Sequence, residues 1–411
     1  MSDVHKIDVL TRVEGHGSVE LVRDGERVVA AHLNMHESPR LFEALLVGRR
    51  FDEVADIACR ICSICSTVHK VVSLQAVEQA LGIDVSQQTR LLRELAVQGG
   101  QIESHALHVF CLALPDYLGL NGFQELAVHE PEKLRMGLRI KKLGNMIQEI
   151  VGGRAIHPFN LLVGGVGTVP KKEQLQDLSD QLAAARNDVT ESISLVFGLK
   201  DILPPLSMSP ACAVSGGPPL FGDHLTTSTK ATIPEVSAAA WLNERVELNS
   251  PAKVSHFAGT TPCLVGPLAR LSLSMPTAYA AHFKDASIRS TLKARIIELQ
   301  QAVERAQDLI ELLREGNLKR ELPVTLISAY GTGTSLIEAP RGVLLHSYSF
   351  DEHGICTNAD IITPTAINQG AMAASLKDLL IAMDGAEYEQ VRTAAEILIR
   401  CYDPCISCAV H

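Results

Sequence analysis

The chain is poor in aromatic residues, in positive charge and in long apolar runs. Aromatic residues make up only 4% of its 411 residues, and 47 acidic residues outnumber 37 Lys and Arg to give a net charge of −10. Nucleic-acid binding relies on basic patches and stacking rings, so this composition argues against it. No stretch approaches the roughly 18 apolar residues of a membrane-spanning helix, and the first residues contain no apolar signal core. We therefore expect neither a nucleic-acid partner nor a direct membrane span.

The abundant residue types suit a large buried core, because 46% of the chain is apolar and 20% is charged. The first 35 residues are strand-like, with Asp24-Gly25 as a hairpin turn. Apolar residues at helical spacing predict helices over residues 66–81, 87–114, 131–151, 171–198, 278–316, 366–384 and 386–400. Between them lie irregular Gly- and Pro-bearing segments with short strands. We predict a helix-rich α+β fold with a core bundle of long helices. We expect a single domain over residues 1–411, with a β region over about 1–36 and a helical body over 37–411.

Ten cysteines are unevenly distributed, at positions 59, 62, 65, 111, 212, 263, 356, 401, 405 and 408. Disulfide-stabilised proteins are usually short and dense in cysteine, and this chain is neither. Three of the cysteines lie within seven residues, and three lie within the last eleven. Such bunching favours metal binding in a reducing compartment over disulfide bonds.

Two C-x2-C pairs, Cys62 with Cys65 and Cys405 with Cys408, offer four thiolates to one metal. Soft sulfur ligands select zinc, iron–sulfur clusters, nickel or copper over hard cations. The spacing alone leaves three alternatives open. They are a structural zinc site, which is the commonest use of such pairs, a thiol–disulfide motif, and the start of an iron–sulfur motif through Cys59. The cluster motif of radical enzymes that use S-adenosylmethionine is not expected, since only three residues follow Cys408.

The segments around and between the cysteines distinguish these alternatives. The motifs that accompany the cysteines are, in chain order, TRVEGHG at 11–17, RICSICSTVH at 60–69, QIESHALH at 101–108, GGRAIHP at 152–158, EAPRG at 338–342 with His346, Pro364-Thr365 with Asn368, and DPCISCAVH at 403–411. Together and in this order they resemble the large subunit of nickel–iron hydrogenases over nearly the whole chain. Two positions depart from the family pattern: Ser63 stands where many members carry Gly, and Cys59 is an additional thiol. Neither departure removes a ligand.

The resemblance implies a binuclear nickel–iron centre whose iron carries carbonyl and cyanide ligands. It implies that Cys62 and Cys405 are terminal nickel ligands and that Cys65 and Cys408 bridge nickel and iron. Thiolates stabilise nickel in more than one oxidation state, and H2 would be cleaved heterolytically at the vacant position between the metals. We expect no iron–sulfur cluster in this chain itself.

Further residues receive roles only through the resemblance. Glu14 matches the family's proton-relay glutamate, and Arg341 matches the arginine that overhangs the vacant metal position. Asp116 and Asp403 resemble the carboxylates that hold this arginine, and His69 is expected to hydrogen-bond a thiolate. Taken alone, each would be an ordinary exposed or turn residue. The groups implied to hydrogen-bond the cyanides are Thr365 and the backbone at Pro340 and Arg341.

A second metal site is implied at the end of the chain. In the family, the C-terminal histidine shares a Mg-type ion with a glutamate and a backbone carbonyl. Here these ligands would be His411, Glu43 and the carbonyl of Ile361.

The resemblance is strongest to the cytoplasmic bidirectional hydrogenases. Electrons would leave through an iron–sulfur small subunit to a flavin-containing or heterodisulfide-reductase module, and no residue decides whether NAD(P), a deazaflavin or a heterodisulfide is the final acceptor. The alternative from another class is a noncatalytic relative whose four cysteines hold a structural zinc ion in an electron-transfer complex. The presence of both Glu14 and Arg341 argues against it, because a structural zinc site needs neither.

Overall fold

The computed structural model describes residues 3–7, 10–24, 27–246, 251–257, 261–283, 286–316, 318–321 and 330–411. The α-helices are α1 (Phe42–Leu46), α2 (Phe51–Ala58), α3 (Ser66–Leu81), α4 (Gln87–Leu107), α5 (Leu114–Tyr117), α6 (Phe123–His129), α7 (Pro131–Gly152), α8 (Lys172–Ala184), α9 (Arg186–Gly198), α10 (Glu235–Leu242), α11 (Pro267–Leu273), α12 (Thr291–Glu315), α13 (Pro364–Ala382), α14 (Tyr388–Tyr402) and α15 (Ile406–Ala409). The strands are β1 (Asp3–Ile7), β2 (Gly17–Asp24), β3 (Arg27–Met35), β4 (Leu161–Leu162), β5 (Gly165–Val166), β6 (Cys212–Gly216), β7 (Phe221–Thr227), β8 (Thr232–Pro234), β9 (Glu244–Val246), β10 (Lys253–Ser255), β11 (Gly331–Ala339), β12 (Gly342–Phe350) and β13 (Cys356–Ile362).

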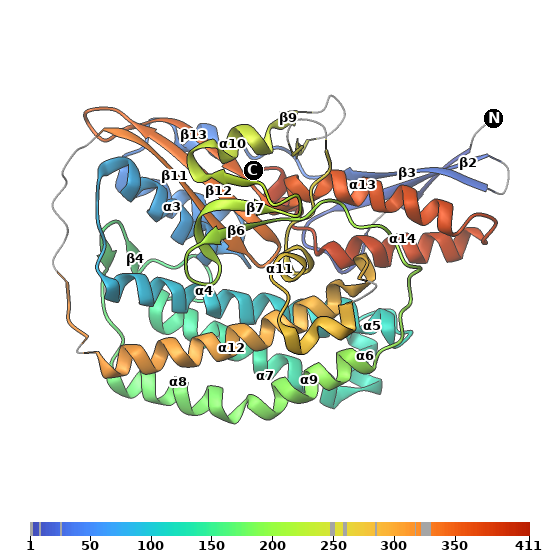
Figure 1. Ribbon diagram of the computed structural model, residues 1–411, viewed down its shortest axis with the longest axis horizontal. Helices are drawn as coiled ribbons and strands as arrows, with labels where there is room; N and C mark the ends of the chain where they lie inside the picture. Colours follow the sequence, from blue (N-terminus) through green and yellow to red (C-terminus); the bar gives the residue numbers. More distant parts are fainter. Residues whose placement is uncertain are drawn as a thin grey trace.

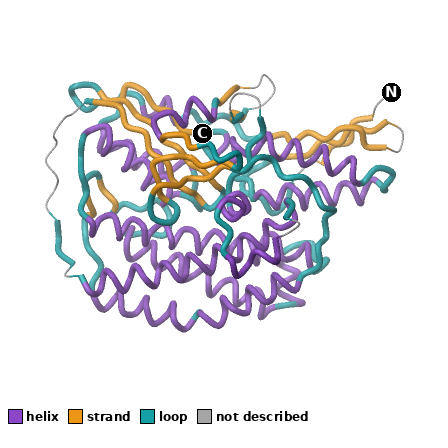
Figure 2. Tube along the Cα trace, viewed as in Figure 1, coloured by secondary structure: helices purple, strands orange, loops and turns teal. Residues whose placement is uncertain are grey.

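A layer of long helices lies beside an antiparallel sheet (Figure 1). Helix α4 packs along α7 and α12, and α8 and α9 cover the other side of α12. Because α4 is buried on nearly all sides, its polar residues lie inside the protein and require partners there. This burial brings Gln101 and His105 into contact with other elements. Figure 2 shows the separation of the helical layer from the strands.

The main sheet has six strands in the order β13-β12-β11-β7-β6, with β8 paired to β7. Strands β11 and β12 form a hairpin in which Ala339 pairs with Gly342, so Pro340 and Arg341 make its two-residue turn. Helix α3 packs across β11 and β12. Gly333 permits this close contact, because a Cβ there would lie 2.1 Å from the carbonyl oxygen of Ala76. The sheet thus presents the Arg341 turn close to α3, which follows the first cysteine pair.

The two ends of the chain pack together. Strands β1, β2 and β3 form a separate antiparallel sheet that projects beside α13 and α14. A backbone bridge joins Glu14, just before β2, to Cys405, just after α14. The fold therefore brings the N-terminal segment to the second cysteine pair.

The predicted helix-rich α+β fold is confirmed, and so are the N-terminal strands and the helix over 66–81. The predicted helix over 278–316 is wrong at its start. Residues 277–283 and 288–290 form 3₁₀ turns, and α12 begins at Thr291. The hydroxyl of Thr291 donates to the carbonyl of Ile288 at 2.6 Å, a local bond that competes with regular helix. The predicted helix over 171–198 is two helices that meet at Ala185.

The predicted helix over 87–114 extends three residues beyond its expected last residue, Leu114, to Tyr117. Helix α4 passes into a π-helical turn over His108–Ala113 and then into α5, which contains Pro115 in its first turn. A proline is tolerated there because the first N–H groups of a helix have no intrahelical acceptor. The π turn directs His108 to the carbonyl of Arg400, 2.8 Å away.

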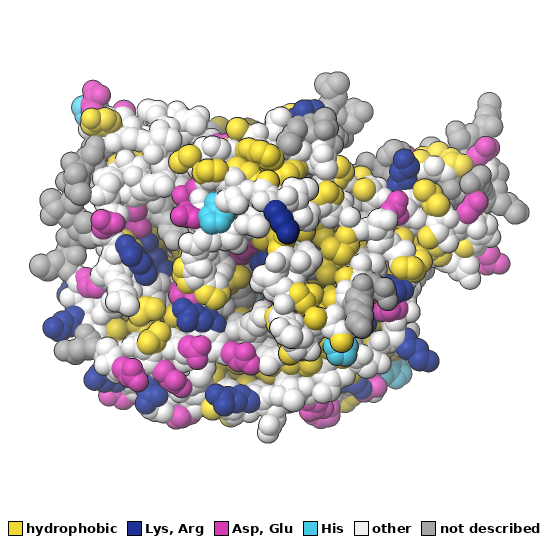
Figure 3. Space-filling view, viewed as in Figure 1, with side chains coloured by type: hydrophobic (Ala, Val, Ile, Leu, Met, Phe, Trp, Pro, Cys, Tyr) yellow, Lys and Arg dark blue, Asp and Glu magenta, His cyan; other side chains and the backbone are white. Residues whose placement is uncertain are grey.

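Among the described ranges, no helix combines the length and the apolar character required to cross a bilayer. The outward side of the helical layer carries acidic and basic side chains together, along its lower edge in Figure 3. This distribution is that of amphipathic helices that bury one face in the core.

Candidate metal centre

The four predicted cysteine ligands converge on one buried point. The sulfur of Cys62 lies 3.6 Å from that of Cys405, and the sulfur of Cys65 lies 3.4 Å from that of Cys408. All four sulfurs lie within 4.8 Å of one another, and all four residues are buried. The two C-x2-C pairs, 343 residues apart in the chain, therefore form one ligand set of soft donors.

Arg40 joins the two cysteine loops. Its guanidinium donates to the carbonyl of Ile61, which precedes Cys62, at 2.5 Å, and also to the carbonyl of Ser407, which precedes Cys408. One planar, multidentate cation thus fixes both loops relative to each other. The sequence offered no signal for this role.

The charge balance of the cysteine set fits a bound metal cation. Burial raises the pKa of the Cys405 and Cys408 thiols well above the ordinary value. Hydrogen bonds from the other three cysteines lower the pKa of Cys62, which favours a negative charge on the Cys62 sulfur. Four buried thiolates need several positive charges nearby, and a metal ion supplies them.

Arg341 reaches this site from the β11–β12 turn. Its Nε donates to the carbonyl of Asp403 at 2.7 Å, and its Nη2 donates to Asp403 Oδ1 at 3.1 Å. Its Nη1 is buried and has no hydrogen-bond partner. Burial alone would lower the pKa of Arg341, but Asp403 and the neighbouring cysteines raise it well above the ordinary value. The guanidinium therefore holds a fixed charge with one free donor.

Asp116 does not hold Arg341, which corrects the prediction. It binds Arg12 Nη2 at 2.5 Å and both Nε and Nη2 of Arg400 at 2.8 and 2.9 Å. Asp116 lies in α5, where these two arginines occupy both of its oxygens. It thus ties the TRVEGHG segment to α14 and leaves Asp403 as the carboxylate of Arg341.

Glu14 contacts the loop of the second cysteine pair. Its backbone carbonyl accepts from the N–H of Ile406 at 3.1 Å, and its carboxylate accepts from the N–H of Ser407 at 3.1 Å. Gly15 makes this approach possible: it has φ +83°, and a Cβ there would lie 2.7 Å from the Cβ of Ile406. The carboxylate is partly exposed, between the cysteine loop and the surface.

His69 lies next to Cys408, with Nε2 3.7 Å from the sulfur. Its Nδ1 is 3.0 Å from Nε2 of His346, whose Nδ1 is 2.5 Å from the hydroxyl of Tyr348. Burial lowers the pKa of His69 to about 4 and that of His346 further, so both rings are neutral near pH 7. Each ring then carries one proton. If the Tyr348 hydroxyl donates to Nδ1 of His346, then Nε2 of His346 donates to Nδ1 of His69. The proton of His69 then lies on Nε2 and points at the Cys408 sulfur.

A small cavity borders three of the cysteines. Its lining combines Cys65, Cys405 and Cys408 with His69, Pro340, Arg341 and Thr365, and the apolar residues Ala339, Leu344 and Pro364 complete it. The hydroxyl of Thr365 accepts from the N–H of Cys405 at 2.9 Å, which leaves its own proton available to another acceptor. Pro340, Arg341 and Thr365, all predicted from the sequence, therefore lie together here.

A profile described as nickel-dependent hydrogenase matches residues 40–135 and 264–411, more than half of the chain. The chain belongs to the nickel-dependent hydrogenase family. It is 36% identical over 428 residues to sulfhydrogenase 2 subunit alpha of Pyrococcus furiosus, covering 99% of this chain and 98% of that one. It is 33% identical over 423 residues to sulfhydrogenase 1 subunit alpha of the same organism, covering 98% and 97%.

The solved structures agree with this assignment. The structure of a NAD⁺-reducing [NiFe]-hydrogenase in the H2-reduced state superposes with a TM-score of 0.86 and 25% identity, over 100% of this chain and 99% of that chain. The Ni-Fe-Se hydrogenase of D. vulgaris Hildenborough, at 23% identity, shows the same fold with a TM-score of 0.83 over the full length of both chains. The predicted large-subunit fold of a nickel–iron hydrogenase is thus confirmed.

This hydrogenase chain also brings together the predicted second metal site. His411 Nε2 lies 2.7 Å from the carbonyl oxygen of Ile361 and 3.8 Å from Glu43 Oε1. Glu244, which the sequence did not reveal, joins Glu43 and His411 as a third side-chain ligand candidate. Neither oxygen of Glu244 accepts a hydrogen bond, although Lys253 Nζ lies 3.0 Å from one of them. Oε1 of Glu244 is buried without any partner, and a bound cation would satisfy it.

Lys253 supplies part of the neutralising charge, since its Nζ is 2.7 Å from both oxygens of Glu43. Burial alone would raise the pKa of Glu43, but hydrogen bonds with His411 and Lys253 lower it to about 2. Burial raises the pKa of Glu244. Lys253 is shared between the carboxylates of Glu43 and Glu244, so negative charge remains for a divalent ion to balance.

The remaining cysteines do not join either site. Cys59, the additional thiol, is buried and donates to the carbonyl of Asp56 at 3.3 Å. Burial raises its pKa to about 11, so it is a protonated thiol. Cys111, Cys212, Cys263 and Cys356 are likewise buried.

Proposed function

We propose that this chain is the catalytic large subunit of a nickel–iron hydrogenase that interconverts H2 with two protons and two electrons. The observation that carries the proposal is the convergence of four buried cysteine sulfurs within 4.8 Å, beside the free Nη1 of Arg341. A structural zinc site would explain the sulfurs and leave a buried, unpaired guanidinium donor without a function.

When bound, the nickel–iron centre supplies the heterolytic cleavage of H2. Cys62, Cys65, Cys405 and Cys408 would hold it, and the family resemblance would make Cys65 and Cys408 the bridging thiolates. Cys65, Cys405 and Cys408 border the small cavity that Arg341 also lines. Arg341 would provide a fixed cation beside the reacting position, and its two hydrogen bonds to Asp403 set the direction of its guanidinium.

Protons are taken from the centre by Glu14. Its carboxylate contacts the loop between Cys405 and Cys408 through Ser407 and is partly exposed on its other side. A carboxylate in that position can accept a proton inside and release it outside. His69 tunes the Cys408 thiolate by donating a hydrogen bond to it.

The iron ligands are carbonyl and cyanide. The Thr365 hydroxyl and the backbone and guanidinium of the Pro340-Arg341 turn line the cavity that would receive these ligands. Cyanide accepts hydrogen bonds, and Thr365 retains a free proton while Arg341 Nη1 retains a free N–H.

Electrons leave to an iron–sulfur small subunit. Apolar side chains on the segment after α7 are about half exposed: Ile156 at 45%, Phe159 at 54% and Leu162 at 45%. This segment is fixed to the start of α3, because the N–H of His157 donates to Ser66 Oγ at 3.0 Å, and Ser66 follows a metal-binding cysteine. An exposed apolar surface so near a ligand suits the docking of an electron acceptor.

The subunit is cytoplasmic and delivers electrons through its partner to a flavin-containing or heterodisulfide-reductase module. The likeness to the NAD⁺-reducing hydrogenase supports the flavin-containing module. Residues 1–411 act as a single domain, because the metal ligands come from both ends of the chain and meet at one point.

The experiment that tests this function is an infrared spectrum of the protein purified without oxygen together with its small subunit. Bands from carbonyl and cyanide on iron, with nickel present and H2 turnover, are expected. Zinc at about one ion per chain, with no such bands and no nickel, would establish the noncatalytic zinc alternative instead.

Arg341→Lys is expected to lower H2 oxidation about tenfold while nickel and iron content stay unchanged. Lysine keeps the charge and loses the planar fork that contacts Asp403 twice, and one hydrogen bond to a charged group is worth about 1.5–3 kcal/mol. The control is Arg392→Lys, which alters an exposed ion pair on α14. Equal turnover in the two variants would remove Arg341 from the mechanism.

The second site is expected to bind Mg²⁺ and to stabilise the fold. A ligand at about 100 times its Kd stabilises a protein by about 2.7 kcal/mol, so Mg²⁺ added to chelator-treated protein should raise the unfolding temperature. Glu43→Gln should abolish this rise, and Glu352→Gln, which alters an exposed carboxylate, should preserve it. A rise of equal size in Glu43→Gln would place the ion elsewhere.

A further inference from the structure

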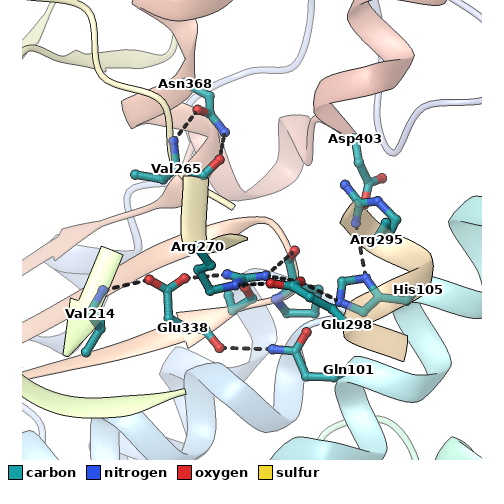
Figure 4. Close-up of polar contacts among 12 residues, drawn as sticks. Gln101, His105, Val214, Val265, Arg270, Arg295, Glu298, Glu338, Asn368 and Asp403 are labelled. Atoms are coloured by element: carbon teal, nitrogen blue, oxygen red, sulfur yellow. Dashed lines mark hydrogen bonds and ion pairs between the residues drawn. The ribbon is translucent and has the colours of Figure 1, made fainter. Parts of the chain in front are cut away.

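A chain of mostly buried charged and polar side chains runs from Glu338 to Asp403, the partner of Arg341 (Figure 4). We call it the charged chain, and its members are Glu338, Arg270, Glu298, His105, Arg295 and Asp403. They come from β11, α11, α12, α4 and the residue after α14, so distant segments meet only in the folded protein. The route already proposed for protons, through Glu14, uses none of them.

The near end of the charged chain holds the side chain of Arg341. Asp403 shares its two oxygens between two arginines: Oδ1 accepts from Arg341 at 3.1 Å, and Oδ2 accepts from Arg295 Nη1 at 3.2 Å. Asp403 has φ 52°, so its backbone turns in the left-handed region between α14 and the second cysteine pair. Arg295 thereby prevents Asp403 from turning both oxygens toward Arg341.

Arg295 contacts the charged chain through one nitrogen of its guanidinium, Nη1, while its buried Nε has no hydrogen-bond partner. It is fully buried, and its Nη1 lies 3.2 Å from Nδ1 of His105. Because an arginine only donates, Nδ1 of His105 accepts, and the proton of this neutral ring lies on Nε2. That nitrogen is 3.2 Å from Glu298 Oε2. The Glu298 carboxylate thus selects the His105 tautomer that can receive Arg295.

The far end of the charged chain holds the backbone that carries Arg341. Arg270 forms a paired contact with Glu298, at 2.6 Å from both Nε and Nη2, and it also binds Glu338. The same guanidinium donates to the carbonyl of Ala339 at 3.1 Å and to that of Pro340 at 3.4 Å. At one end of the charged chain, Asp403 binds the side chain of Arg341. At the other end, Arg270 binds the backbone of the turn that carries Arg341.

The charged chain cannot pass protons along its length near neutral pH, because two of its members are guanidinium groups that do not give up their protons in proteins. Its remaining function is to fix charges and atoms in place. We propose that Arg295, supported by His105 and Glu298, is a positioning residue that sets the direction of Arg341 through Asp403. This inference rests on the proposed hydrogenase function.

The test compares Arg295→Met with Arg305→Met. Arg305 stands on the same helix and forms an ion pair with Glu94 at 2.6 Å, but it does not contact the charged chain. In a crystal structure of the metal-free subunit, Arg295→Met should let Asp403 bind Arg341 through both oxygens, which removes the free Nη1. Arg305→Met should preserve the wild-type contacts.

In the holoenzyme, Arg295→Met should lower kcat for H2 oxidation by about 100-fold, the loss that a displacement of about 1 Å can cause, with KM within about twofold of wild type. In the Arg341→Lys background the same change should cost only about twofold, because it acts through Arg341. An additive loss would overturn the proposal, as would an unchanged Asp403 carboxylate in the crystal. If Arg295→Met does not fold, Arg295→Lys and Glu298→Gln are each compared in the same way, alone and in the Arg341→Lys background. Wild-type enzyme without H2 turnover would instead refute the proposed function.

Discussion

Cys408→Ser is expected to leave the protein without nickel and without hydrogenase activity. Cys408 lies at the centre of the ligand set, with its sulfur 2.8 Å from that of Cys405 and 3.4 Å from that of Cys65. A serine hydroxyl is a hard donor that does not ionise near neutral pH, so it cannot replace a thiolate shared by two metals. Losing even an outer partner of a metal ligand costs about 10- to 100-fold in metal affinity. Losing the ligand itself should exceed this range, and metal analysis together with the infrared spectrum measures it.

Cys401→Ser provides the matched control. Cys401 is also buried near the end of the chain, but it packs in the hydrophobic cluster of α13 and α14, away from the four ligands. Burial raises its pKa to about 12, so it stays a thiol. The control should keep nickel and the carbonyl and cyanide bands. Retention of these bands in Cys408→Ser would remove Cys408 from the centre. Their loss in Cys401→Ser would indicate that Cys401, Cys405 and Cys408, spaced C-x3-C-x2-C, bind metal together.

The ligand residues could be predicted from the sequence because each lies in a short motif with its partner. The C-x2-C spacing brings two sulfurs to one point within a single loop, and the order of the motifs indicated that the two loops share that point. The structure places them as expected. Glu14, His69 and His411 follow the same logic, since each lies within one of these motifs and contacts a cysteine loop. Glu43 lies outside the motifs and was predicted only through the resemblance to the family.

The residues that hold the ligands in place could not be found in this way. Arg40, Arg295 and Glu244 each stand in stretches where a charged residue would ordinarily face solvent. The partners of Arg40 and Arg295, and the groups that meet Glu244 in the second site, lie tens to hundreds of positions away, so only the packing of the folded chain reveals them. The signal that could have found Arg295 is its position on the apolar face of a long helix, where an unpaired cation would be costly.

The error at Asp116 has the same origin. The resemblance indicated two carboxylates, Asp116 and Asp403, beside the arginine of the site, and only Asp403 contacts it. Two further arginines, Arg12 and Arg400, compete for Asp116 and occupy both of its oxygens. Sequence motifs predict which residue types meet more reliably than which pairs form, because pairing depends on side chains contributed by several segments.

Glu14→Gln is expected to suppress hydrogen–deuterium exchange catalysed by the holoenzyme by about 100-fold or more, since a positioned acid–base group typically contributes about 10²- to 10⁴-fold. Glutamine has nearly the same shape, and its amide oxygen can still accept from the N–H of Ser407, as Glu14 does at 3.1 Å. The backbone bridge to Cys405 is unaffected, because it involves main-chain atoms. Nickel content and the infrared bands should therefore remain, and only the proton acceptor is lost.

The control for Glu14→Gln is Glu20→Gln, which changes a carboxylate on β2 that accepts from Asn34 at 3.1 Å and does not contact the cysteine loop. This variant should exchange deuterium at the wild-type rate. Normal exchange in Glu14→Gln would refute the relay and direct attention to another exit from the site. Loss of both exchange and nickel would mean instead that the carboxylate holds the loop through Ser407 and that its charge is structural. Because these outcomes differ in metal content, one preparation of each variant separates a proton relay from a scaffold.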